Sequence, residues 1–259
     1  MSRPSKTGTV NDHIRIIASC LAPSMKSLGE GYRALVIGAT GAIGSGFVSV
    51  LRTDPNCAEV VEVSRAQFPD FSLENEASMI QVSTQIGQRG PFALIVDATG
   101  ALTIDGNGPE KHLGALDPER LMRSFQVNAI GPVLLLKHFL PRLVSGRAIY
   151  AKLSARVGSI SDNKKGGWYG YRASKAALNM FLQTAAIEFA RKNPSAVIAA
   201  LQPGTVQSNL TKPFVGQEGI LTPYESASGL LQALDVLGLD QVGHQGAFFL
   251  DYQGQAIDW

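Results

Sequence analysis

The sequence has little cysteine, little excess charge and no long hydrophobic run, and each absence argues against a class of protein. Its two cysteines, Cys20 and Cys57, give neither a disulfide framework nor the ligand spacing of a metal site. The 23 Lys and Arg residues against 21 Asp and Glu residues leave a net charge of +2, without the basic excess that nucleic acid usually requires. No apolar run approaches the roughly 18 residues needed to cross a bilayer. We therefore expect no nucleic-acid or membrane partner and, because free thiols suit a reducing compartment, a cytoplasmic location.

The length and composition are those of one domain with a sizeable core, since 45% of the 259 residues are hydrophobic. Residues 1–30 are irregular and weakly basic, and the strand-like run Ala34–Ile37 follows them abruptly. We interpret residues 1–30 as an extension outside the fold and residues 31–259 as a single domain. A weakly basic extension with Ser and Thr could be an organelle transit peptide, but a poorly ordered terminus is the commoner explanation.

From Tyr32 onward, short apolar runs alternate with longer amphipathic stretches, which is typical of a parallel sheet covered by helices. We expect a Rossmann-like, doubly wound α/β fold. The predicted strands are Arg33–Gly38, Glu59–Ser64, Phe92–Asp97, Arg147–Ser154, Val197–Gln202 and Ala247–Asp251. The predicted helices are Ala42–Arg52, Glu74–Gln88, Pro118–Leu143, Tyr171–Lys192 and Tyr224–Val236. Gly131–Pro132 must distort or divide the third helix, because proline cannot donate the helical hydrogen bond.

A glycine-rich turn, Gly38-x-x-Gly41-x-x-Gly44, joins the first predicted strand to the first predicted helix. Glycines here allow a tight turn and bring the backbone close to a pyrophosphate at the helix N-terminus. The turn therefore predicts a dinucleotide site, which also takes in Thr40 and Ile43. An ordinary strand-to-helix turn is the alternative, and the position of the motif in the first strand-helix unit argues against it.

Ser64 and Arg65 stand at the end of the second predicted strand, about 20 residues beyond Gly44. NAD-specific folds place an acid there for the ribose 2'-hydroxyl. A hydroxyl and a guanidinium instead suit a 2'-phosphate, whose charge an acid would repel. The pair predicts a preference for NADP over NAD, with a merely solvated Arg65 as the alternative.

Tyr171 and Lys175 are four residues apart in a predicted helix, so their side chains share one face. Hydride delivery to a carbonyl creates an alkoxide that needs a proton. A phenol can supply this proton if nearby positive charge lowers its pKa from about 10. Lys175 can provide that charge, and in the reverse direction Tyr171 becomes a general base. An aromatic anchor beside a solvated lysine is the alternative, but the cofactor turn upstream favours a shared site.

In their order and spacing, these motifs resemble the short-chain dehydrogenase/reductase family from about Arg33 to Trp259. The match includes Asn128 in Val-Asn-Ala and the run Pro203-Gly204-Thr205-Val206. The stretches 153–162 and 171–179 more narrowly resemble a C-factor-like carbonyl-reductase branch. The resemblance implies an NADPH-dependent reductase of an aldehyde or ketone. Because this branch also has a signalling role, a nucleotide-bound regulatory protein with little turnover is the rival.

The resemblance also assigns roles to single residues. Asn128 would hold a water in a proton relay that reaches Lys175, and a helix-bending asparagine is the alternative. Pro203 and Gly204 would turn the chain beneath the nicotinamide. The residues implied near its carboxamide are Thr205, Val206 and Ser208.

The sequence departs from the family where the catalytic serine normally closes the fourth strand. The register places Ala155 there, in Ser154-Ala-Arg-Val-Gly158. Counting back from Tyr171 leads instead to Ser159, in a loop able to bring it inward. Ser159 is the preferred catalytic serine and Ser154 the second choice, because adjacent strand residues face opposite sides. A loop serine bonded to its own backbone, and hence no catalytic serine, is the remaining alternative.

A second departure lies after the third predicted strand, where the family has Asn-Asn-Ala-Gly. Here the run is Asp97-Ala98-Thr99-Gly100, and all four are predicted in the cofactor site through backbone contacts. Side-chain support at this run is open. The apolar faces of Pro118–Leu143 and Tyr171–Lys192 resemble those of dimeric or tetrameric relatives, but the sheet could equally cover them.

Overall fold

The computed structural model describes residues 23–207, 220–238 and 246–259. Its centre is a six-stranded parallel sheet of order β2-β1-β3-β4-β5-β6. The strands are β1 (Tyr32–Ile37), β2 (Cys57–Val63), β3 (Leu94–Asp97), β4 (Ala148–Leu153), β5 (Ala196–Gln202) and β6 (Phe248–Asp251). The α-helices are α2 (Ala42–Leu51), α3 (Glu76–Gly87), α4 (Pro118–Phe125), α5 (Gly131–Phe139), α6 (Tyr169–Ala190) and α7 (Pro223–Val236). The predicted doubly wound α/β fold is confirmed.

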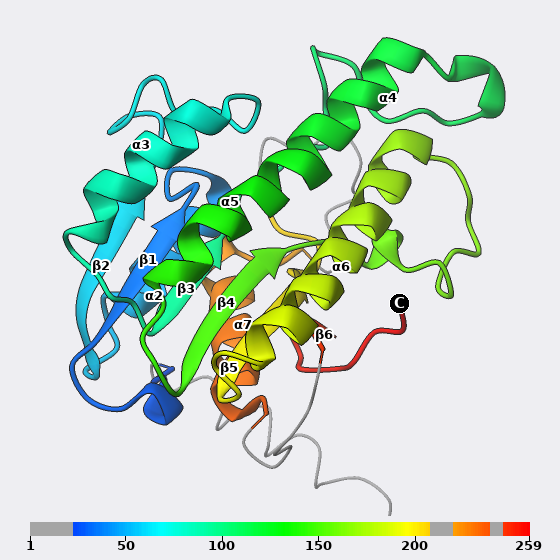
Figure 1. Cartoon of the computed structure of the whole chain (residues 1–259). Coiled ribbons are helices and arrows are strands. Elements are labelled where there is room, and N and C mark those ends of the chain that lie inside the picture. Colours follow the sequence, from blue (N-terminus) through cyan, green and yellow to red (C-terminus); the bar gives the residue numbers. More distant parts are fainter. Residues whose placement is uncertain (1–22, 208–219, 239–245) are drawn as a thin grey trace, which may run out of the picture.

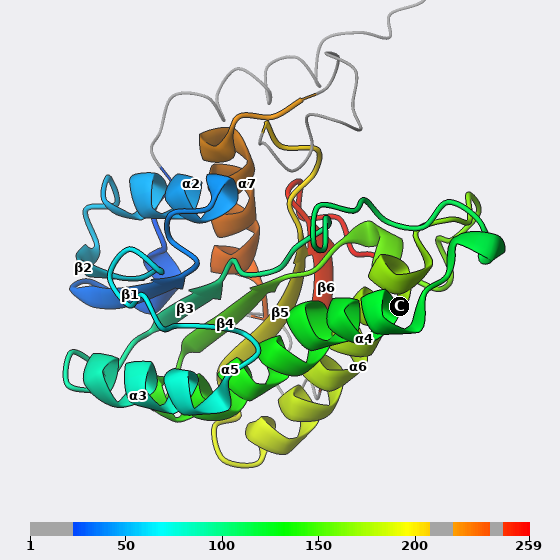
Figure 2. The same ribbon diagram turned by 90° about the horizontal axis from the view of Figure 1, so that it is seen from above.

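Helices cover both faces of the sheet. Figure 1 shows α3, α4, α5 and α6 in front of the strands and α2 and α7 behind them, and Figure 2 shows the same layers from above. Strand β1 explains the arrangement, because its residues 34–37 are completely buried and alternate between two cores. Leu35 and Ile37 pack with α3 and α5, whereas Ala34 and Val36 pack with α2 and α7. A strand that is buried on both faces has a continuous run of apolar residues, and this run is the pattern that predicted β1 from the sequence.

The strand order reverses between β1 and β3. From β1 the chain runs outward to β2 on one side, and then returns to β3 on the other. In open α/β sheets, ligands bind at such a switch point, beyond the carboxyl ends of the strands. The turns after β1, β2 and β3 all lie at this edge.

The predicted helix 118–143 is divided, as expected, directly before Gly131 and Pro132. Between α4 and α5, residues Gln126–Ile130 form a π-helical turn, in which the Gly131 N–H bonds to the Gln126 carbonyl. Pro132 has no N–H to donate to the Asn128 carbonyl four residues earlier. Gly131 is needed for packing, because a Cβ there would lie 2.4 Å from the Leu73 carbonyl oxygen.

The last part of the predicted N-terminal extension packs against the domain. Met25 is buried in the core beside α2 and α7, and its N–H donates to Asp54 Oδ2 at 2.8 Å. The Ser27 N–H donates to Asp235 Oδ1 at 2.7 Å. The domain therefore begins before residue 31, where the sequence predicted its start. The segment was missed because it is held by these two carboxylates and has no apolar periodicity of its own. Residues 1–22 lie outside the described part of the chain.

Candidate active site

The glycine turn has the geometry that a dinucleotide site needs. Gly38 adopts φ +82° directly after β1, and its N–H donates to the Val63 carbonyl at the end of β2. A Cβ on Gly44 would lie 2.1 Å from the Gly38 carbonyl oxygen, so this position in α2 excludes any side chain. Gly41 precedes the first residue of α2, and Thr40 beside it is exposed. Ile43 is half-buried against the core behind the sheet.

Ser64 and Arg65 follow β2, next to the glycine turn. Ser64 is buried, and its carbonyl accepts N–H groups of Gln67 and Phe68 at 3.1 and 2.9 Å. Arg65 is exposed and forms no ion pair within the described residues. An unpaired guanidinium at this edge is available to an anionic ligand.

A buried ion pair joins β3 to β4 and holds the residues that follow β3. Asp97 and Lys152 are register partners on β3 and β4, with exposures of 0% and 1%, and Lys152 Nζ lies 2.9 Å from Asp97 Oδ1. Lys152 Nζ also donates to the Thr99 carbonyl at 2.7 Å and to its hydroxyl at 3.0 Å. Thr99 returns its N–H and hydroxyl proton to Asp97 Oδ1. The side-chain support left open by the sequence is therefore present, and Lys152 provides it.

Gly100 brings the run after β3 to the catalytic candidates. It adopts φ +138°, and a Cβ on it would lie 3.2 Å from Asn128 Oδ1 and 3.4 Å from Lys175 Nζ. Asn128 is completely buried, and its amide forms two hydrogen bonds with the backbone of Ala101, at 2.8 and 2.9 Å. The Asn128 side chain thus fixes this loop.

Tyr171 and Lys175 lie in the first turns of α6 and share one face, as their spacing predicted. Lys175 Nζ is 5.7 Å from the centre of the Tyr171 ring and donates to the Leu153 carbonyl, at the end of β4, at 3.1 Å. Burial, and secondly the positive charge of Lys152, lower the pKa of Lys175 to about 7, although Asp97 acts in the opposite sense. Burial raises the pKa of Tyr171 to about 12, which differs from the lowering expected from its cationic neighbour. Desolvation of the phenol is therefore the effect that sets its pKa in the chain alone.

The two candidate serines have different hydrogen bonds. Ser154 is buried, and its hydroxyl donates to Asn179 Oδ1 on α6 at 2.6 Å. Ser159 is also buried, and its Oγ accepts the Asp162 N–H at 3.0 Å. The loop before Ser159 touches α6 at Lys175, because a Cβ on Gly158 would lie 2.8 Å from Lys175 Cβ. Within the described residues, neither serine bonds to Tyr171.

The predicted nicotinamide-side run follows β5. Gly204 adopts φ +75°, and a Cβ there would lie 2.9 Å from atoms of both Leu221 and Tyr252. The chain continues through Thr205 to Val206, which forms a bridge with Leu221. Pro203 precedes the turn, and its carbonyl accepts the Ser226 hydroxyl. Ser208 lies outside the described residues.

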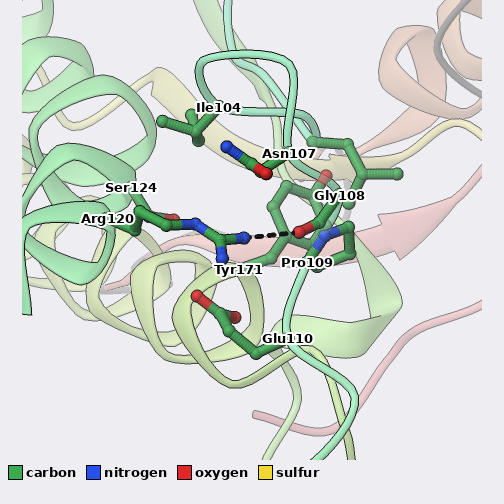
Figure 3. A pocket seen from close by; sticks show the side chains of 9 residues that line it. Ile104, Asn107, Gly108, Pro109, Glu110, Arg120, Ser124 and Tyr171 are labelled. Carbon is green, nitrogen blue, oxygen red and sulfur yellow. Dashed lines mark hydrogen bonds between the residues drawn. The ribbon is translucent and has the colours of Figure 1, made fainter. Parts of the chain in front are cut away.

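A small pocket adjoins Tyr171 on the side away from the sheet. Its lining includes Leu102, Ile104, Glu110, Arg120, Ser124 and Tyr171 (Figure 3). Glu110 and Arg120 were not predicted as site residues, because no local motif in the sequence marks them. In the chain that the structure describes, no three His, Cys, Asp or Glu residues gather as a metal site. No helix of that part is both long and apolar enough to span a membrane.

Comparison with known proteins agrees with this geometry. A family model described as short chain dehydrogenase matches residues 33–219. The chain is 33% identical over 172 residues to the C-signal of Myxococcus xanthus, covering 66% of this chain and 94% of that protein. It is 28% identical over 192 residues to a 1-hydroxy-2-glutathionyl-2-methyl-3-butene dehydrogenase of a Rhodococcus species, covering 74% of this chain and 79% of that protein.

Solved structures share the fold. An NADPH-bound carbonyl reductase from chicken fatty liver superimposes with a TM-score of 0.74 at 23% identity, covering 89% of this chain and 95% of that one. Carbonyl reductase Sniffer of Drosophila melanogaster also gives a TM-score of 0.74, at 21% identity, covering 89% of this chain and 100% of that one.

The buried ion pair generates a stability prediction. We expect Lys152→Met to lower the free energy of unfolding by about 3–5 kcal/mol, because the carboxylate of Asp97 is left buried without its cation. Urea unfolding followed by circular dichroism measures the change. The double variant Asp97→Leu/Lys152→Met should lose less than the single one, since no buried charge remains.

Lys137→Met is the matched control for this experiment. Lys137 forms its ion pair with Glu76 at the surface, where its side chain is 62% exposed, so the free energy of unfolding should hardly change. If Lys137→Met and Lys152→Met lowered the free energy of unfolding equally, the loss could not be assigned to the buried carboxylate of Asp97.

Proposed function

Since the chain belongs to the short-chain dehydrogenase family, we propose that it reduces an aldehyde or ketone to the alcohol with NADPH, reversibly. The observation that carries the proposal is the meeting of Tyr171, Lys175 and Asn128 beside Gly100 at the carboxyl edge of the sheet. A binding module would have little need for a buried phenol and ammonium held together. When bound, NADPH supplies a hydride to the carbonyl carbon, and the carbonyl oxygen takes its proton from the protein.

The residues around the switch point fit this cofactor. Gly38 and Gly44 let the turn and the N-terminus of α2 pack closely, since a Cβ on Gly44 would lie 2.1 Å from the Gly38 carbonyl oxygen, and a helix N-terminus favours a phosphate. Arg65, with Ser64 beside it, would bind a 2'-phosphate. The runs 97–100 and 203–206 would line the adenosine and nicotinamide sides. Solved structures of similar fold that hold NADP or NADPH support the same choice.

In the proposed reaction Tyr171 is the acid. Its hydroxyl proton goes to the alkoxide oxygen as the hydride reaches the carbon, and Lys175 stabilises the phenolate that remains. The proton is then replaced from solvent through Lys175 and the relay assigned to Asn128. In the oxidation of an alcohol, Tyr171 takes the proton instead.

Ser159 is the proposed hydrogen-bond donor to the substrate oxygen. Its Oγ accepts the Asp162 N–H, and within the described residues its own proton has no acceptor. Ser154 is less suited, because its proton is committed to Asn179. Tyr171 and Lys175 acting without a serine remain the third arrangement.

The rival function is that of a nucleotide-bound signalling protein with little turnover. Ala155, in the place of the usual serine, favours it, and so does the similarity to C-signal. NADPH binding with no turnover on any carbonyl would establish this rival.

Two expectations accompany the proposal. The protein would be cytoplasmic. Assembly into a homodimer or homotetramer would use the outer faces of α4 and α6, where Met122, Met180 and Phe181 are exposed. Size-exclusion chromatography with light scattering measures this assembly.

Replacing the phenol tests the chemistry. We expect Tyr171→Phe to lower kcat/KM for reduction by about 10²–10⁴, with NADPH affinity little changed, because only the proton donor is lost. NADPH oxidation over a panel of aldehydes and ketones gives the rate, and cofactor fluorescence gives the affinity. Tyr169→Phe, two residues earlier in α6, is the control, and this variant should keep the wild-type kcat/KM. Ser159→Ala should also lose activity and Ser154→Ala much less; the reverse order would reassign the serine.

Replacing Arg65 tests the cofactor preference. Arg65→Glu should weaken NADPH binding about tenfold or more and leave NADH binding nearly unchanged, because the new carboxylate repels only a 2'-phosphate. Fluorescence titration of both cofactors measures the change. Arg191→Glu, an exposed substitution at the end of α6, should alter neither affinity. Equal losses for NADPH and NADH in Arg65→Glu would overturn the 2'-phosphate assignment.

The pKa of about 7 at Lys175 predicts a pH dependence. Lys175 is charged below this pKa, and only the charged form stabilises the Tyr171 phenolate, so kcat/KM for reduction should fall as the pH rises through it. Initial rates at constant ionic strength, with NADPH affinity measured at each pH, separate this effect from cofactor binding. A rate that rises over the same range would contradict the role of Lys175.

A further inference from the structure

The pocket beside Tyr171 contains a cation whose charge is not balanced by a partner. The guanidinium of Arg120, from α4, lies in the middle of the lining, and its Nη2 donates to the Gly108 carbonyl at 2.8 Å (Figure 3). Its Nε is buried and has no hydrogen-bond partner in the described chain. No carboxylate oxygen of the described residues comes within 4.0 Å of this guanidinium. A half-buried cation that is satisfied only by a carbonyl is an unusual element in a pocket wall.

The acids around Arg120 are engaged elsewhere. Glu110 also lines the pocket, but it is 6% exposed and its Oε2 accepts the Gly170 N–H, at the start of α6, at 3.0 Å. Asp117 caps α4 by accepting the backbone N–H of Arg120 at 2.9 Å, and Asp105 pairs with Arg123 at 3.5 Å. The Oε2 atom of Glu110 is thus directed at a helix N-terminus, which favours negative charge. Arg120 is left as the group that can attract an anion.

The pocket is small and partly open to solvent. The apolar side chains of Leu102 and Ile104 flank the polar groups, which is the usual composition of a site that orients a small molecule.

We propose that this pocket binds a carboxylate group of the substrate through Arg120, so that the protein prefers carbonyl compounds bearing an acid to neutral ones. The guanidinium matches a carboxylate in charge and in planar geometry. Tyr171, the proposed proton donor, lines the same pocket as Arg120. A substrate whose carboxylate binds Arg120 would therefore have its carbonyl group near Tyr171. This inference rests on the proposed function, because it names the class of substrate for the same site.

A purely structural role for Arg120 makes a different prediction. The hydrogen bond to Gly108 ties the loop before Glu110 to α4, and losing that tie would disturb every substrate alike. If Arg120 instead binds a substrate carboxylate, its loss weakens the binding of the acid alone. Two ligands that differ only in having a carboxylate or its methyl ester therefore distinguish substrate recognition from structural support.

The experiment titrates 4-acetylbenzoate and methyl 4-acetylbenzoate by calorimetry into the full chain, free and saturated with NADP⁺, which cannot reduce the ketone. We expect the acid to bind at least about tenfold more tightly than the ester, as a charged hydrogen-bonded pair allows. In Arg120→Met, this ratio should fall to about one while ester binding stays unchanged. Arg123→Met, with its exposed guanidinium on the same helix, should keep the wild-type ratio.

Three outcomes would overturn the inference: equal binding of acid and ester by the wild type, equal losses for both ligands in Arg120→Met, or the same loss of the ratio in Arg123→Met. A parallel assay of NADPH oxidation with both compounds and their aldehyde analogues reports on the proposed function. No turnover together with an intact preference for the acid would refute the reductase and leave the carboxylate site standing. Turnover of both compounds without any preference for the acid would support the reductase and refute the carboxylate site.

Discussion

The contact between Asp97 and Lys152 holds the centre of the site together. It joins neighbouring strands at the carboxyl edge, where β3 ends and β4 continues toward Leu153. Through Thr99, the same ammonium shapes the turn that leads to Gly100, where a Cβ would crowd both Asn128 and Lys175. An ion pair this deep is weak evidence for stability, since desolvation offsets much of its attraction. Its value here lies in geometry, because it orders Thr99 and the turn that leads to Gly100.

The pair also sets the charges that Lys175 experiences. Burial first, and then the positive charge of Lys152, lower the pKa of Lys175 to about 7, while Asp97 acts in the opposite sense. Burial raises the pKa of Tyr171 to about 12. In the chain alone, Lys175 therefore loses its proton more easily than a free lysine, and Tyr171 holds its proton more tightly than a free tyrosine.

Local patterns were enough to predict the architecture. The strands are continuous apolar runs, and the helices have a 3.6-residue period, so their identity does not depend on distant contacts. The same is true of Gly38 and Gly44, whose roles follow from backbone sterics, and of the four-residue spacing of Tyr171 and Lys175. Met25 was misplaced because its packing depends on carboxylates that follow it in the chain by tens of residues or more.

Lys152 and Arg120 show where such reasoning stops. The visible signal for Lys152 was a lysine inside an apolar strand, but its partner is fixed only by the register of β3 against β4. Arg120 gives no signal at all, because its surroundings are assembled from α4, α6 and the loop between β3 and α4. The choice between Ser154 and Ser159 depends likewise on how the loop after β4 folds over α6, which no spacing rule determines.

The glycine turn and Arg65 belong to the segment from β1 to α3, whereas Tyr171, Lys175 and both serines belong to the segment from β4 to α6. In the sheet β3 lies between these two segments and pairs with β1 on one side and with β4 on the other. Asp97 and Lys152 join β3 to β4, so a substitution at either position acts on the strand that links the two segments.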